Sequence, residues 1–156
     1  MMLDSDKMIS DLFDIAHERK IRVYYKHLLP DEESFIVSHG GESYIYLEVC
    51  LNGFAEIKHF AHEVGHDFVG ISDKTTSAWL SEAFERRACE WAVTYLIKYD
   101  EFIQTLQNPF VRNDFEAAEE LGVDIETVER VRQYYERKDL KVRQCDVVNW
   151  WDFVTT

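Results

Sequence analysis

The sequence feature that most constrains this chain is a His-Glu-x-x-His motif, which runs from His62 to His66. Residues four apart lie on the same face of an α-helix, so both imidazoles can reach one metal ion, and Glu63 flanks them by about 100°. This spacing suits zinc, which binds imidazole nitrogen in a tetrahedral site. The alternative is a solvated helix face that carries two histidines by chance, so a third ligand has to decide between them.

The helix expected around the motif also carries an apolar stripe, roughly opposite the two histidines. Its members recur at i, i+4, i+7 and i+11: Ile57, Ala61, Val64 and Phe68. The stripe is therefore expected to face the core, and the histidines a cleft. Gly65 lies inside the helix, where glycine costs about 1 kcal/mol relative to alanine, which indicates a close neighbour at that point. Gly70 is expected to end the helix.

A second helix is expected from Ser81 to Ile97, with acidic residues in its first turn. Glu85 falls within a stripe of mostly small residues on this helix: Ala88, Cys89, Ala92 and Leu96. Burying an unpaired carboxylate is costly, whereas a carboxylate that coordinates a cation is compensated. We therefore predict that Glu85 is the third zinc ligand. The alternative is an ion pair with Arg86 or Arg87.

The two segments together resemble the ImmA/IrrE family of metallo-endopeptidases, gluzincin-like proteins often carried by prophages and integrative elements. The resemblance rests on Phe-Ala-His-Glu-Val-Gly-His at residues 60–66, on Glu-x-x-Ala-Cys-x-Trp-Ala-x-x-x-Leu-Ile at residues 85–97, and on their order and spacing. It implies that His62, His66 and Glu85 bind Zn²⁺ and that Glu63 is the catalytic base. It also implies an intracellular endopeptidase with an anti-repressor role, whose substrate is a DNA-binding, helix-turn-helix repressor.

The expected fold is α+β and zincin-like. It begins with a helix from Ser5 to about Lys20, capped by Ser5 or Asp6, and a small three-stranded sheet follows before the motif helix. Strands are expected at residues 21–26, 34–38 and 42–49, with a hairpin turn at His39-Gly40-Gly41. In gluzincin-like folds such a sheet has an edge strand beside the cleft, where an extended peptide could add as another strand.

The length of 156 residues and a hydrophobic content of 46% favour a single domain over residues 1–156, with a core at 20–100. No segment approaches the ~20 apolar residues of a membrane span, and the N-terminus is acidic where a signal peptide is basic. We expect a cytoplasmic protein without a membrane partner. Three cysteines far apart in the sequence are expected as reduced thiols: Cys50, Cys89 and Cys145.

The net charge of −13 disfavours nucleic acid as a ligand and attracts a basic protein partner, or simply keeps the protein soluble. Residues 114–138 have the spacing of a helix-turn-helix, but Asp124 and Glu126 stand where a DNA reader carries basic or amide side chains. We therefore expect a structural helical hairpin. Two alternatives to the protease stay open: a non-proteolytic regulatory module that associates with a repressor or an antitoxin, and a DNA-associated regulator acting through residues 114–138.

The remaining histidines and the aromatic C-terminal segment are not expected to bind the metal. His59 lies one turn before His62 and is expected beside the site, because a ligand from a second helix closes a tetrahedron more readily. Three histidines are expected on the surface: His17, His27 and His39. The aromatic segment 145–156 is expected to pack on the domain or to form a contact surface.

Overall fold

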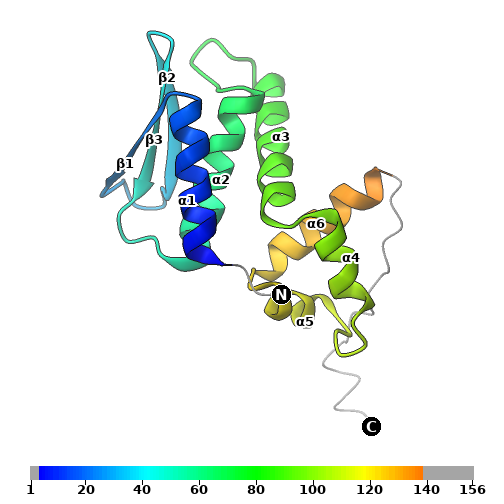
Figure 1. Cartoon of the computed structure of the whole chain (residues 1–156). Coiled ribbons are helices and arrows are strands. Elements are labelled where there is room, and N and C mark those ends of the chain that lie inside the picture. The colour runs from blue at the N-terminus through cyan, green and yellow to red at the C-terminus, as the bar shows by residue number, and fades with distance from the viewer. Residues whose placement is uncertain (1–3, 139–156) are drawn as a thin grey trace. The chain divides into compact units, whose positions relative to one another are not determined.

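The structure is a computed structural model that describes residues 4–138. Within this range the fold is α+β, with six helices and one three-stranded sheet (Figure 1). The chain divides into two compact units, residues 4–96 and the described residues from 97 onward. The single domain over residues 1–156 stays a prediction, and the segment 145–156 with its cysteine lies outside the described residues.

The first unit follows the predicted order of a helix, a small sheet, the motif helix and a second helix. It contains α1 (Ser5–Glu18), β1 (Ile21–Lys26), β2 (Ser34–His39), β3 (Glu42–Glu48), α2 (Gly53–Val69) and α3 (Ala78–Leu96). The N-cap of α1 is Asp4, one residue before the predicted caps, and its side chain accepts a hydrogen bond from the amide of Lys7.

The sheet has the strand order β1-β3-β2, so β3 is central and β2 is an edge strand. The predicted hairpin joins β2 and β3 through Gly40 and Gly41, whose φ angles of 62° and 81° favour a two-residue turn of the type common in hairpins. Strand β1 pairs in parallel with β3, with Lys26 opposite Glu48. The parallel pairing brings the carboxyl ends of β1 and β3 to the same edge of the sheet.

One face of the sheet is buried and the other is open. Ile45 and Leu47 of β3 are completely buried, as their alternation predicts. Tyr46 points to the other face, where its ring stacks on Tyr24 and Phe35 at centroid distances of 5.5 and 4.9 Å. Val49, which lies within the predicted strand, is exposed because the strand ends one residue earlier, at Glu48.

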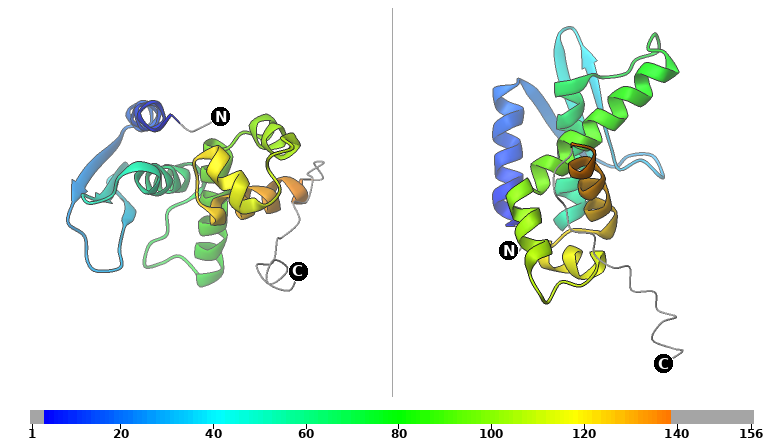
Figure 2. Two further views of the ribbon diagram at one scale, coloured as in Figure 1. Left: turned by 90° about the horizontal axis from the view of Figure 1, so that it is seen from below. Right: turned by 90° about the vertical axis from the view of Figure 1, so that its right-hand side faces the viewer.

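Helix α2 lies between the sheet and α3 (Figure 1), and two further views show the same neighbours (Figure 2). Three members of its predicted apolar stripe are completely buried: Ile57, Ala61 and Val64. The fourth, Phe68, was expected in the core but is 44% exposed. Its ring instead stacks on Trp91 of α3 at 5.0 Å, and the guanidinium of Arg19 lies 3.7 Å from its centroid.

Helix α3 begins at Ala78, three residues before the predicted start. The hydroxyl of Ser77 accepts a hydrogen bond from the amide of Leu80 at 3.2 Å, as a helix cap does. The first turn is therefore not acidic, contrary to the prediction, and Glu85 lies two turns into the helix. The predicted stripe of small residues is buried at Ala88 and Ala92, and it faces α2.

The closest approach of α2 and α3 is at Gly65. A Cβ atom at this position would lie 2.7 Å from the carbonyl oxygen of Ala88 and 3.2 Å from its Cα atom. Both atoms belong to the backbone of α3, so a side-chain rotation cannot relieve the clash. The close neighbour predicted for this glycine is therefore confirmed.

The second unit contains α4 (Tyr99–Gln107), α5 (Asp114–Leu121) and α6 (Ile125–Arg137). The predicted helical hairpin is confirmed, since Gly122 has φ 72° and Asp124 caps α6 through the amide of Thr127. The buried hydroxyl of Tyr135 donates a hydrogen bond to the carbonyl of Ile97 at 2.8 Å, which ties α6 to the start of the unit. None of the helices between residues 4 and 138 has the length and apolar character needed to cross a membrane.

We predict that Gly65→Ala destabilises the protein by about 1–3 kcal/mol, because the added methyl group forces α2 and α3 apart. The better helix propensity of alanine offsets this by about 1 kcal/mol at most. Urea unfolding followed by circular dichroism measures the change. Because the clash is with backbone atoms, the additional substitution Ala88→Gly is not expected to restore stability, and a Gly65→Ala variant as stable as the parent would contradict the close packing.

Candidate metal centre

The geometry of His66 is set by the end of its own helix. Gly70 follows α2 with φ 143°, and its amide donates to the carbonyl of His66 at 2.8 Å, so the predicted stop at this glycine is confirmed. The carbonyl oxygen of Gly70 lies 3.0 Å from Nδ1 of His66, a hydrogen bond that requires the proton on Nδ1. In the neutral ring Nε2 is then left with a free lone pair, the arrangement that metal-ligating histidines adopt.

Glu85 of α3 reaches both histidines of the motif. Its Oε1 atom lies 2.8 Å from Nε2 of His62, and its Oε2 atom lies 2.8 Å from Nε2 of His66. The two imidazole rings stand edge to face at 4.9 Å. The structure thus brings together the three predicted ligands from two helices, with their ligand atoms within 4.8 Å of one another.

The electrostatics of this group are those of two histidines paired with one carboxylate. Burial by itself lowers the pKa of His62, but hydrogen bonds with Cys89 and Glu85 outweigh it and raise the pKa to about 10. The pKa of His66 is raised for the same reason, through Glu85 and Gly70. Hydrogen bonds from His62 and His66 hold the pKa of Glu85 far below its usual range. A metal ion would therefore displace protons from the imidazoles when it binds.

Glu85 is not buried as its apolar neighbours led us to expect. Its side chain is 63% exposed, because it lies before the buried part of α3, whereas Ala88 and Ala92 are in the core. Its carboxylate nevertheless contacts the two histidines, and not Arg86 or Arg87, the partners in the alternative. The site therefore opens to solvent on the side of Glu85, while His66 is 8% exposed.

The three residues fit a zinc ion by their chemistry and their freedom to adjust. Two imidazole nitrogens and one carboxylate form the donor set of many catalytic zinc sites and leave a fourth position open. Two ligands on one tetrahedral zinc ion stand about 3.3 Å apart. The 2.8 Å separations are hydrogen-bond lengths, so the exposed Glu85 side chain would withdraw by about 0.5 Å.

Glu63 faces a different neighbour. It is 6% exposed, and the hydroxyl of Ser34 at the start of β2 donates a hydrogen bond to its Oε1 atom at 2.6 Å. One turn later, the hydroxyl of Ser43 in β3 donates to Oδ1 of Asp67 at 2.7 Å. The sheet thus holds two carboxylates on one side of α2, and the predicted base is oriented by a hydrogen bond instead of pointing freely into solvent.

His59 lies beside this arrangement, as predicted. Its Nδ1 atom is 3.4 Å from the hydroxyl of Ser34, and its Nε2 atom contacts the carboxylate of Glu33. Burial lowers the pKa of His59. A continuous set of polar contacts therefore runs from Glu33 through His59 and Ser34 to Glu63.

Three contributors to the site had not been assigned from the sequence: Ser34, Cys89 as a partner of His62, and the carbonyl of Gly70. Ser34 carries no motif, and only the pairing of β2 with β3 places it beside α2. Gly70 was recognised as a helix stop, and a histidine four residues before such a stop is the signal that could have revealed the hydrogen bond.

No protein-family model, curated protein or solved structure matches this chain. The assignment of a function therefore rests on the geometry of the site and on the motif resemblance.

We predict that the purified protein binds zinc through this group, and that His62→Ala and Glu85→Ala each lower its zinc content by about one equivalent per chain. Plasma mass spectrometry after dialysis measures the content. Glu82→Ala, an exposed carboxylate one turn earlier on α3, is the matched control and is expected to retain the metal. Full zinc retention in Glu85→Ala would remove Glu85 from the site.

Proposed function

We propose that this chain is a zinc-dependent endopeptidase of the ImmA/IrrE type, with His62, His66 and Glu85 as ligands and Glu63 as the general base. The observation that carries the proposal is the convergence of both histidines on one carboxylate from a second helix, with a separately oriented carboxylate next to them. A zincin-like fold, with the motif helix beside a small sheet, is part of the same proposal.

The roles of the residues follow from their positions. Bound zinc supplies a Lewis acid that polarises the scissile carbonyl and lowers the pKa of water. Glu63 accepts a proton from the attacking water and passes it to the leaving amine nitrogen as the peptide C–N bond breaks. Ser34 holds the carboxylate of Glu63 in place while the proton moves, because its hydroxyl can keep donating to one oxygen.

Edge strand β2 supports a substrate that binds as an extended peptide. Its first residue, Ser34, contacts the proposed base, and within residues 4–138 no strand pairs with its outer edge. The net charge of −13 favours a basic partner. A DNA-binding, helix-turn-helix repressor of a prophage or integrative element meets both requirements, and its cleavage in the cytoplasm would give the protein an anti-repressor role.

The main competing function is a regulatory module that binds a repressor or an antitoxin without cleaving it. The observation in its favour is that the two histidines and Glu85 satisfy one another by direct contacts at 2.8 Å. For such a module the group is an ion pair that fastens α2 to α3. Activity that survives the loss of the base would favour it.

Direct contact with DNA is the weaker alternative. The start of α6 is acidic, and Asp124 is occupied as the helix cap, while Glu126 pairs with Arg130 at 2.7 Å. Arg132 pairs with Asp114 of α5. The basic side chains of the hairpin that could meet phosphate groups are therefore partly neutralised by carboxylates.

We predict that Glu63→Gln retains the zinc and the fold but loses peptide hydrolysis by roughly 10²–10⁴-fold, because an amide cannot accept a proton from water. A proteome-derived peptide library, analysed by mass spectrometry, detects cleavage whatever the sequence of the substrate. The repressor encoded beside the gene is then tested as an intact protein, with and without a zinc chelator.

Cleavage that a chelator does not stop, or that persists in Glu63→Gln, would contradict the proposal. A repressor that is bound but left intact by the zinc-loaded parent would establish the regulatory module in its place.

We also predict that Ser34→Ala lowers kcat by about tenfold, with KM and zinc content nearly unchanged, because the substitution frees the carboxylate of Glu63 to rotate. Ser43→Ala is the matched control, since it removes an equivalent bond from a serine in the sheet to a carboxylate of α2, at Asp67. It is expected to retain full kcat. Equal losses in the two variants would show that both bonds act only through stability.

A further inference from the structure

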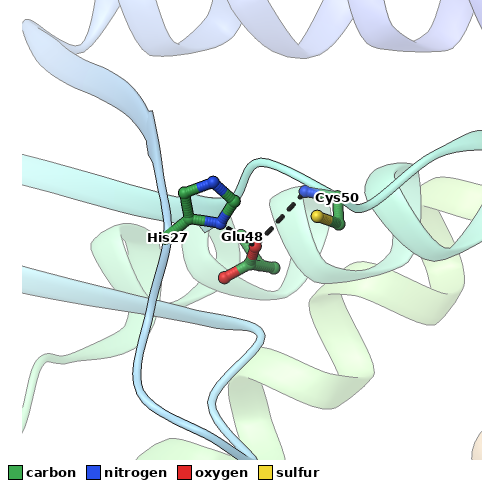
Figure 3. A group of neighbouring side chains, drawn as sticks. All are labelled: His27, Glu48 and Cys50. Carbon is green, nitrogen blue, oxygen red and sulfur yellow. Dashed lines mark hydrogen bonds and ion pairs between the residues drawn. The ribbon is translucent and has the colours of Figure 1, made fainter.

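A second group of metal-ligating side chains lies where β1 and β3 end (Figure 3). His27 directly follows β1, Glu48 is the last residue of β3, and Cys50 comes two residues later. The parallel register pairs Lys26 with Glu48, and the amide of Val49 donates to the carbonyl of Lys26 at 3.0 Å. The backbone thus places a histidine and a cysteine from two different connections beside one carboxylate.

The carboxylate of Glu48 is held in place by the backbone. Its Oε2 atom accepts a hydrogen bond from the amide of Leu28 at 2.6 Å, and its Oε1 atom lies 3.4 Å from the amide of Cys50. The amide of Leu28 is also the main reason that the pKa of Glu48 lies below its ordinary value. The side chain is 19% exposed, so a carboxylate oxygen held by backbone amides faces the two outer residues.

The remaining distances suit a tetrahedral ion. Nδ1 of His27 lies 3.3 Å from Oε1 of Glu48, and two nitrogen or oxygen ligands of one zinc ion stand about 3.3 Å apart. The Sγ atom of Cys50 lies within 4.8 Å of both other ligand atoms. Both His27 and Cys50 are exposed, so rotation about their side-chain bonds can close the remaining gap without moving the backbone.

We propose that His27, Glu48 and Cys50 form a second metal site, which takes Zn²⁺ or a similar late first-row divalent cation. One imidazole, one carboxylate and one thiolate make a borderline-soft donor set, which zinc accepts and magnesium or calcium does not favour. The thiol of Cys50 gives its proton to solvent on binding, and the fourth position stays open to water. The ion would tie the connection after β1 to the connection before α2.

The site shares no residue with the group around Glu85. The second metal site and the proposed protease activity can therefore be tested independently. The test uses the full chain with Co²⁺, because a thiolate ligand gives cobalt a charge-transfer band in the near ultraviolet that imidazole and carboxylate do not. We expect this band in the parent and in His62→Ala, and its loss in Cys50→Ser and in His27→Ala. Saturating Zn²⁺ is expected to slow alkylation of Cys50 by at least about tenfold, read at the peptide level by mass spectrometry.

Two matched controls separate this site from other cysteines and histidines. Cys89→Ser removes the thiol that contacts His62, and His39→Ala removes an exposed histidine of β2 that lies opposite Glu42 in the strand register. Both variants are expected to keep the cobalt band. A band that survives in Cys50→Ser, a band that disappears in Cys89→Ser or His62→Ala, or unchanged alkylation of Cys50 in zinc would each overturn the proposal.

Discussion

The contact on which the first unit depends is the approach of Gly65 to the carbonyl of Ala88. A Cβ atom at residue 65 would lie only 2.7 Å from this carbonyl oxygen. Because glycine has no Cβ atom, α2 and α3 lie close enough for side chains to bridge them. His62 and His66 flank this glycine on α2, and Glu85 lies one turn before Ala88 on α3. The meeting of two imidazoles with one carboxylate is therefore a consequence of the backbone packing of α2 against α3.

Helix α2 separates two kinds of polar side chain. His62 and His66 face α3 and meet a carboxylate from that helix, whereas Glu63 and Asp67 meet hydroxyl groups from the sheet. The proposed base, Glu63, thus shares α2 with the proposed ligands but is held by a different layer of the fold. In the proposed site, this separation lets the orientation of Glu63 be altered through Ser34 without changing His62, His66 or Glu85.

The local parts of this arrangement could be predicted from the sequence, and the parts that depend on pairing could not. The motif, the close approach at Gly65 and the stop at Gly70 follow from spacing and from glycine itself. The exposure of Phe68 could not be predicted, because helical periodicity does not say where the neighbouring layer ends. The contact of Ser34 with Glu63 depends on how the sheet packs against α2, which the strand and helix patterns of the sequence do not specify.

The register of β2 against β3 has a consequence for how the chain can vary. Ser34 lies opposite Leu47 in the hairpin, so its hydroxyl shares the buried face of the sheet with a core residue. Side chains alternate along a strand, and a slip of one residue in β2 would carry the hydroxyl to the opposite face. The length of the turn at Gly40 and Gly41 therefore sets the register of the hairpin. A single residue inserted there would break the hydrogen bond from Ser34 to Glu63 and leave the sequence of the His-Glu-x-x-His helix unaltered.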